Sequence, residues 1–251
     1  MDKLEQGIKY LLAYNRINTE IDAYSFDAFR ALMNITIPDK LDGSFFLLQD
    51  SIIKDEYKKK TLVSLNEIEK LSKNIYLYKG DITLLKVEAI VNACNSKLLG
   101  CFIPLHRCID NAIHSYAGLQ VRRDLMIVMD KQNHDEENGL VKVTSGYNLP
   151  AKYIYHTVGP IIYGSETKND ILDLQNCYLS CLNKAKEMKL HTLAFPCIST
   201  GEYHFSNALA SKIAYETVSD FLKNNLELDL KVVFVTFKDI DYSLYKEKGE
   251  K

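Results

Sequence analysis

The spacing of apolar residues along the chain changes near residue 75. Before it, apolar side chains recur at intervals of three and four, which is the period of a helix buried along one face. This spacing is found at residues 8–12, 26–33 and 62–71, and a further helix is expected at 45–53. These segments contain no obvious cluster of polar residues that would indicate a functional site. Residues 1–74 are therefore predicted to form a helical N-terminal extension whose role is packing.

From residue 75 onward, short apolar runs alternate with helical patterns. The runs typical of buried strands are 75–78, 89–93, 140–145, 153–158, 192–197 and 232–237. The helical patterns between and after them are 109–129, 170–188, 207–224 and 242–248. This alternation predicts an α/β domain whose sheet is covered by helices on both faces, with ligands bound in the loops beyond the strand ends.

Composition and charge narrow the functional classes. The 251 residues are 47% hydrophobic and 25% charged, which is typical of a globular chain, and the net charge of −2 disfavours general binding to nucleic acid or acidic membranes. The first 22 residues hold no apolar leader segment, and no stretch approaches the roughly 20 apolar residues of a membrane span. We therefore expect a soluble, cytoplasmic protein with no nucleic-acid or membrane partner.

The six cysteines contain one local signal. Without a leader segment they are not expected to form a disulfide framework. Cys101, His106 and Cys108 place two thiols and an imidazole within eight residues, a donor set that suits zinc better than a hard cation. No fourth ligand is evident, which argues against a closed structural site, whereas three ligands and an open position are typical of catalytic zinc. Ordinary buried cysteines beside a satisfied histidine remain the alternative.

Three further polar signals lie where strands are expected to end. Asn92 and Asn95 are expected to emerge at the end of the 89–93 strand, and Asp81 follows the 75–78 strand in a turn that could simply cap a helix. The loop at 199–203 precedes a helix, so its backbone N–H groups could face a phosphate. Each signal is ambiguous when taken alone.

Read in order, four segments resemble the motif series of a macrodomain: 80–96, 112–118, 153–160 and 197–201. Loop 100–108 resembles that of the zinc-containing, sirtuin-linked class of macrodomain ADP-ribosyl hydrolases, and segments 29–34 and 47–50 resemble its helical extension. The resemblance implies a three-layer α/β/α macrodomain over residues 75–251, with a mixed, mostly parallel central sheet. The N-terminal helical extension over 1–74 would precede it. Two departures are Cys94 in place of alanine and Ser206 in place of proline.

The same resemblance assigns roles to individual residues. Asn95 and Asp110 would be catalytic, and Cys101, His106 and Cys108 would hold zinc beside the distal ribose. Asp81 would accept a hydrogen bond from the adenine amino group, Phe237 would pack on the adenine, and Tyr203 would lie near the distal ribose. The full set of residues expected to contact ADP-ribose is Asp81, Ile82, Asn95, Ser199, Thr200, Gly201, Glu202, Tyr203 and Phe237.

The resemblance also implies an activity: zinc-dependent removal of mono-ADP-ribose from acidic side chains of modified proteins, with release of ADP-ribose. Members of this class reverse the modification made by a sirtuin-type transferase, including modification of a lipoyl-carrier protein, and this partner rests on analogy alone. Two alternatives stay open. One is an O-acetyl-ADP-ribose deacetylase that uses the same pocket, and the other is a non-catalytic ADP-ribose reader.

Overall fold

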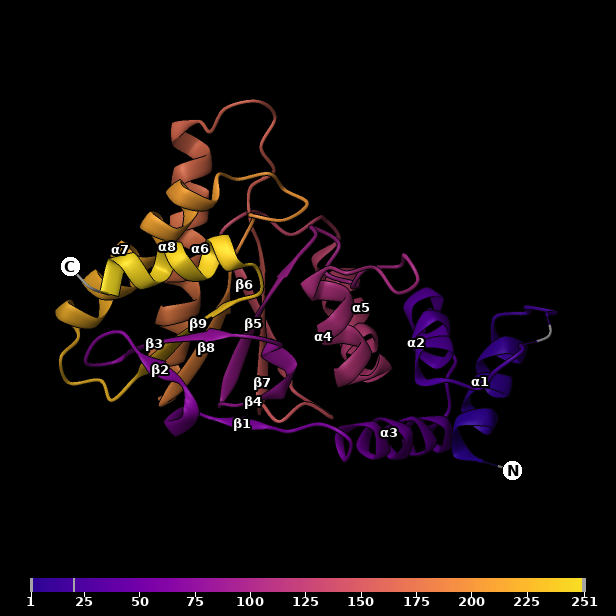
Figure 1. Ribbon diagram of the computed structural model, residues 1–251. Coiled ribbons are helices and arrows are strands. Elements are labelled where there is room, and N and C mark those ends of the chain that lie inside the picture. Colours follow the sequence, from indigo (N-terminus) through magenta and orange to yellow (C-terminus); the bar gives the residue numbers. More distant parts are fainter. Residues whose placement is uncertain (1, 20, 250–251) are drawn as a thin grey trace.

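The computed structural model describes residues 2–19 and 21–249. A seven-stranded mixed sheet forms its centre (Figure 1). Its strands, in spatial order, are β2 (Glu69–Lys70), β3 (Ile75–Lys79), β9 (Lys231–Thr236), β8 (Thr192–Pro196), β5 (Ala89–Cys94), β7 (Tyr153–Val158) and β6 (Val141–Ser145). The two edge pairings, β2 with β3 and β6 with β7, are antiparallel, and the inner pairings are parallel. A separate two-stranded parallel sheet joins β1 (Val63–Ser64) to β4 (Leu85–Lys86).

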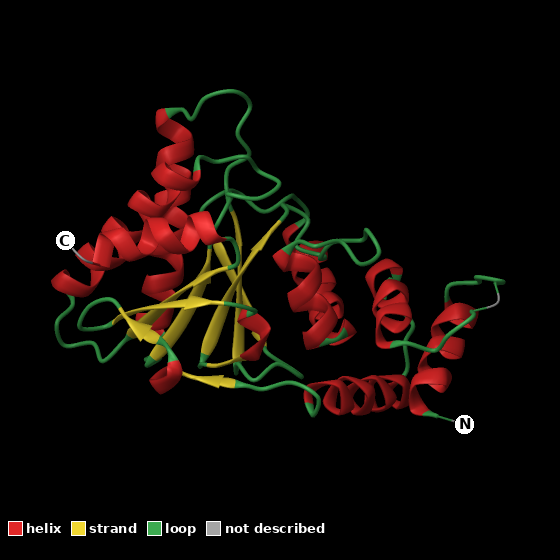
Figure 2. Cartoon of the chain, in the orientation of Figure 1, coloured by secondary structure: helices red, strands yellow, loops and turns green. Residues whose placement is uncertain are grey.

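Helices cover both faces of the sheet, as the alternating pattern predicts (Figure 2). One face carries α6 (Lys168–Glu187), α7 (Asn207–Asn224) and α8 (Asp239–Gly249), and the other carries α4 (Ile109–Ala117) and α5 (Leu119–Gln132). Neighbouring positions of a strand serve opposite faces: in β9, Val232 and Phe234 pack toward α6–α8 while Val233 and Val235 pack toward α4. The expected three-layer α/β/α architecture is confirmed.

The N-terminal extension is a helical unit with its own core. It contains α1 (Lys3–Tyr14), α2 (Phe26–Ile35) and α3 (Gly43–Tyr57), and α2 and α3 begin at N-caps supplied by the side chains of Ser25 and Asp42. Its apolar core includes Leu119 at the start of α5, so the extension packs against the α4–α5 layer. Figure 1 shows α4 and α5 lying between the sheet and the extension.

Two expectations about local structure are wrong. Residues 62–71 are not a helix: a Ser64–Glu67 capping box closes a single 3₁₀ turn, and the flanking residues form β1 and β2 because their backbones pair with β4 and β3. The pattern at 109–129 is two helices, which Gly118 separates with a φ of +103°. The division between residues 1–74 and 75–251 stays a prediction, and the pairing of β2 with β3 crosses it.

Across the described ranges 2–19 and 21–249, the structure holds no helix that is both long enough and apolar enough to span a bilayer.

Candidate active site

A cavity of about 1180 Å³ opens at the carboxyl ends of four neighbouring strands. Asp81 follows β3, Asn95 follows β5, the 197–203 loop follows β8 and Phe237 follows β9, and all of these line the cavity. Parallel strands in a sheet end at the same edge, so loops distant in sequence meet there.

Every residue that the sequence analysis assigned to the site lies on this cavity. The set is Asp81, Ile82, Asn95, Cys101, His106, Cys108, Asp110, Ser199, Thr200, Gly201, Glu202, Tyr203 and Phe237. Their shared location is a structural fact, whereas the contacts each makes with a ligand stay predictions.

Cys101, His106 and Cys108 form a compact donor cluster at one part of the cavity. One ligand atom from each residue lies within 4.8 Å of the others, and Cys101 Sγ is 3.6 Å from His106 Nδ1. The other ring nitrogen, Nε2, is 3.8 Å from a carboxylate oxygen of Glu202, which is too long for a hydrogen bond but brings this carboxylate beside the imidazole. Two thiols and an imidazole at this separation fit a thiophilic metal such as zinc.

Cys108 also begins helix α4. Its sulfur accepts a hydrogen bond from Asn111 N at 3.4 Å, so the residue is the N-cap of the helix. Burial is the largest influence on this thiol and raises its pKa to about 12. A cysteine in this position binds a metal only with release of its proton, so metal affinity there depends on pH.

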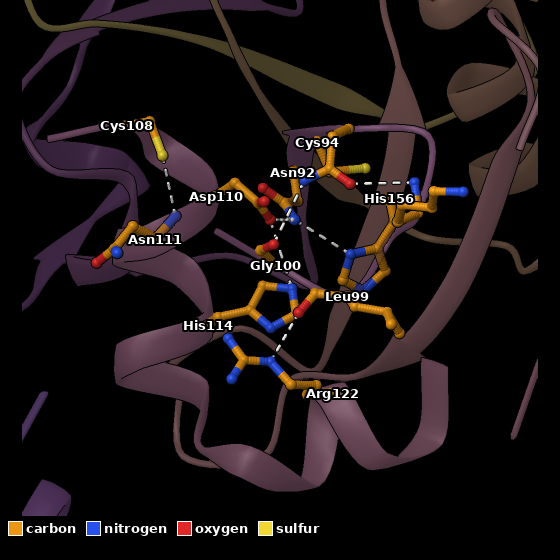
Figure 3. Close-up of polar contacts among 12 residues, drawn as sticks. Asn92, Cys94, Leu99, Gly100, Cys108, Asp110, Asn111, His114, Arg122 and His156 are labelled. Atoms are coloured by element: carbon orange, nitrogen blue, oxygen red, sulfur yellow. Dashed lines mark hydrogen bonds and ion pairs between the residues drawn. The ribbon is translucent and has the colours of Figure 1, made fainter. Parts of the chain in front are cut away.

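Asp110 is a buried carboxyl group in the first turn of α4 (Figure 3). Its Oδ1 accepts a hydrogen bond from Asn92 Nδ2 at 2.8 Å and lies 3.4 Å from His114 Nε2. Its Oδ2 has no hydrogen-bond partner among the residues that the structure describes. Burial raises the pKa of Asp110 to about 6, with the hydrogen bond from Asn92 acting in the opposite direction.

A buried histidine orients the Asn92 amide. Asn92 Nδ2 lies 3.2 Å from His156 Nδ1, and His156 Nε2 lies 2.9 Å from Thr144 Oγ1. Burial lowers the pKa of His156 to about 3, so the ring is neutral at pH 7. Because the Asn92 amide donates to Nδ1, the ring proton sits on Nε2 and faces Thr144.

The expectation that Asn92 emerges at a strand end is wrong, because its side chain is fully buried inside β5. The sequence did contain a signal. An amide within a continuous apolar strand must find buried partners, and these come from other elements, α4 and β7. Asn95, one residue beyond β5, does reach the cavity, where its side chain accepts from Lys97 N and donates to Gly100 O.

The 199–203 loop is shaped by close backbone approaches. Ser199 has a φ of +63°, and a Cβ on the facing Gly159 would lie 2.1 Å from its hydroxyl oxygen. The hydroxyl of Ser199 is buried without a hydrogen-bond partner among the described residues. Ser206, where the resemblance leads one to expect proline, donates its backbone N–H to Glu166, a bond that proline could not make. Gly159 was not among the expected site residues.

Asp81 and Phe237 line another part of the cavity. One oxygen of Asp81 accepts hydrogen bonds from the backbone N–H and the hydroxyl of Thr83, the capping arrangement that the sequence left as an alternative. Phe237 is 82% exposed, which leaves its ring available to a planar ligand.

Burial raises the pKa of Tyr203 to about 12, so its hydroxyl keeps its proton at pH 7.

The expectation that the extension only packs is wrong in one respect. Asp27 and Arg30 of α2 line the cavity, and Arg30 donates a hydrogen bond to Asn111 at 3.4 Å. Their spacing carries no motif, so only the packing of α2 beside α4 brings them to the site.

Comparison with known proteins identifies the family of this chain. Residues 91–214 match the Macro domain family. A curated protein-ADP-ribose hydrolase of Treponema medium is 42% identical over 223 residues, which cover 87% of this chain and 85% of that protein. Among solved structures, the Oceanobacillus iheyensis macrodomain with ADP has a TM-score of 0.65 and 36% identity, and covers 73% of this chain and 94% of its own.

A second solved structure matches a larger share of this chain. The Trypanosoma brucei macrodomain in complex with ADP-ribose has a TM-score of 0.67 and 25% identity, and the match covers 87% of this chain and 94% of that one. The fold, the pocket at the strand ends and these relatives agree, and the chain belongs to the macrodomain family.

Proposed function

We propose that this protein is a metal-dependent protein-ADP-ribose hydrolase that removes mono-ADP-ribose from acidic side chains, with zinc held by Cys101, His106 and Cys108. The observation that carries the proposal is the contact between His106 and Glu202, at 3.8 Å. It places the donor cluster beside the 199–203 loop, so one ligand could meet both. The hydrolase relative in Treponema medium supports the reaction class.

Different cavity residues would bind different parts of ADP-ribose. Backbone N–H groups would hold the diphosphate together with the Ser199 hydroxyl, which has no hydrogen-bond partner in the described part of the chain, and this would let a chain of net charge −2 bind an anion. Asp81 and Phe237 would receive the adenine, and Asn95 and Tyr203 the distal ribose. The cavity volume of about 1180 Å³ exceeds the ~300–1,000 Å³ typical of small-ligand pockets, leaving space for part of the modified protein.

Asp110 would meet the reacting end of the sugar. Its Oδ2 lacks a hydrogen-bond partner within residues 2–19 and 21–249, while Asn92 holds the other oxygen, Oδ1, in place. In the bound state, Oδ2 would hydrogen-bond a ribose hydroxyl or the attacking water, which gives Asp110 a positioning and proton-transfer role. A bound zinc ion would supply Lewis acidity, either to a ribose hydroxyl or to a water molecule. Hydrolysis of the ester at C1″ would release ADP-ribose and restore the carboxylate.

The test measures zinc content and turnover together. Elemental analysis of purified protein should find about one zinc per chain, and chelation should abolish turnover of an Asp- or Glu-ADP-ribosylated protein. Cys101→Ala should lose both metal and activity. Cys181→Ala is the matched control, because it removes a buried thiol from α6 outside the cavity. Full turnover in Cys101→Ala with unchanged metal content would refute the metal role.

The choice of substrate separates the remaining readings. Preference for serine-linked ADP-ribose would overturn the acidic-side-chain assignment. Cleavage of O-acetyl-ADP-ribose alone would make the protein a deacetylase, and binding of ADP-ribose without turnover of any ester would make it a reader. A lipoyl-carrier protein modified by a sirtuin-type transferase is the substrate that the family resemblance suggests.

A cytoplasmic location belongs to the same proposal, and the six free cysteines suit a reducing compartment.

A further inference from the structure

The loop that carries the three donor residues has little regular structure of its own. Between β5 and α4 it contains neither helix nor strand, and Leu98, Gly100 and Leu105 all have positive φ values. Most residues from 102 to 107 are exposed. Its internal backbone support includes the bond from His106 N to Ile103 O. A metal site needs its ligands held in place, so this loop depends on neighbouring elements.

Asn34, in the last turn of α2, is one such support. Its side chain is 1% exposed; Oδ1 accepts a hydrogen bond from Leu105 N at 3.0 Å, and Nδ2 donates to Ser115 Oγ at 3.1 Å. One amide thus joins the extension to the donor loop and to α4. Leu105 directly precedes His106 and has a φ of +56°, a conformation that leucine rarely adopts. The bond from Asn34 holds the backbone in that conformation.

A second path runs through Asn111 of α4. Its Nδ2 donates to Ile103 O at 3.0 Å, and its Oδ1 accepts from Arg30 of α2 at 3.4 Å. Ile103 is therefore fixed by a residue that α2 in turn orients. The two paths hold the loop at positions 103 and 105, on the segment that separates Cys101 from His106.

Arg122 of α5 ties the start of the loop to the end of α2. Its Nε donates to Leu99 O at 2.7 Å (Figure 3), and one terminal nitrogen donates to the carbonyls of Met33, Asn34 and Thr36 at 2.6–2.9 Å. Its guanidinium also lies 4.3 Å from the centroid of the Phe102 ring. A cation at the carboxyl end of a helix is electrostatically favourable, so the guanidinium satisfies α2 and the loop together.

We propose that Asn34 is a positioning residue of the metal site: through its bond to Leu105 it holds His106 at the distance from Cys101 and Cys108 that metal binding requires. The helical extension is then an integral part of the metal centre rather than a separate packing unit. This inference rests on the proposed function for the presence of a metal, and it adds a residue outside the loop that shapes the metal site.

Asn34→Ala would remove a hydrogen-bond partner that orients a metal-binding residue. Such changes typically weaken metal binding by about 10–100-fold. We expect Asn34→Ala to raise the dissociation constant for zinc within that range. The absorption of the cobalt-substituted protein should change too, because thiolate–cobalt bands report ligand geometry. Asn34→Asp keeps an acceptor oxygen for Leu105 N and should bind zinc close to the wild-type affinity.

A matched control separates positioning from general loss of stability. Asn15 is also an asparagine of the extension, and its Nδ2 bonds Leu11 O and Thr36 Oγ1 without touching the donor loop. Asn15→Ala should therefore lower the melting temperature of the extension without changing zinc affinity.

The experiment measures zinc affinity of the full chain by competition with a chromophoric chelator, together with cobalt absorption and thermal unfolding. Weakened zinc binding in Asn34→Ala, with wild-type binding in Asn15→Ala and rescue in Asn34→Asp, supports the inference. Wild-type affinity and spectrum in Asn34→Ala overturn it, as do equal losses in both alanine variants or failure of rescue. A wild-type protein that binds no zinc overturns the proposed metal dependence, and this inference with it.

Discussion

Acid should destabilise the protein through His156, whose ring is fully buried between Asn92 and Thr144. Burial lowers its pKa from 6.5 to about 3. Below pH 6.5 the unfolded chain takes up a proton at this histidine, while the folded chain stays neutral until about pH 3. The stability from a neutral His156 is therefore complete above pH 6.5 and is lost as the pH falls from 6.5 towards 3.

The magnitude follows from the two pKa values. Between pH 7 and pH 5, preferential protonation of the unfolded state at His156 removes about 2 kcal/mol from the free energy of unfolding. Two groups near it also titrate. His114 has a lowered pKa from burial and acts in the same direction. Burial raises the pKa of Asp110 to about 6, so this carboxyl group takes up its proton at a higher pH in the folded state than in the unfolded state. Its protonation therefore adds about 1 kcal/mol to the free energy of unfolding between pH 7 and pH 5.

Comparison with a variant isolates the His156 contribution. His156→Asn keeps an acceptor for the Asn92 amide and cannot titrate, so its stability should fall about 2 kcal/mol less than the wild type's between pH 7 and pH 5. Urea unfolding at both pH values measures this. With an m-value of about 2–3 kcal/mol/M, the shifts in midpoint should differ by roughly 0.7–1 M. Equal shifts in the two proteins would refute the argument, whatever the variant costs at pH 7.

Two further predictions test close packing. Gly159→Ala should weaken ADP-ribose binding about 10-fold or more by calorimetry, since the new Cβ would meet the Ser199 hydroxyl at 2.1 Å; Gly43→Ala, whose Cβ would meet nothing within 4 Å and which lies in α3 outside the cavity, should bind like wild type. Equal affinities in these variants would contradict a role for the Gly159 contact. Gly7→Ala should destabilise the extension by roughly 1–3 kcal/mol, because its Cβ would lie 2.6 Å from Ile52 Cδ1, and an unchanged thermal transition would show that α1 and α3 can separate freely.

The local pattern of apolar residues was enough to predict most strands of the sheet. The motifs at the strand ends were enough to name the expected site residues. The strand expected at 153–158 is β7 and the helix expected at 207–224 is α7, because continuous apolar runs and helical spacing report burial directly. The site residues follow strand ends, and the parallel order of the sheet brings those ends together. The resemblance to macrodomains assigned positions 81, 95, 199 and 237 to one pocket, and the parallel order of the strands explains why these loops meet.

Short segments and long-range partners could not be assigned in the same way. Residues 62–71 carry helical spacing, yet they form β1, one 3₁₀ turn and β2, since hydrogen bonds to β4 and β3 outweigh a weak local preference. The burial of Asn92 depends on His156, which lies 64 positions away in sequence. No periodicity encodes a partner at that separation.

The sequence by itself determined the layered α/β fold through apolar patterns within single segments, and it determined the family and the expected site residues through the resemblance carried by an ordered series of motifs. Only the tertiary structure decided which groups touch: His106 with Glu202, Asn92 with Asp110, and Asn34 with the backbone of Leu105. These contacts join elements whose relative placement is set by packing of the whole core. For the same reason, the extension that looked like packing alone delivers side chains to the donor loop.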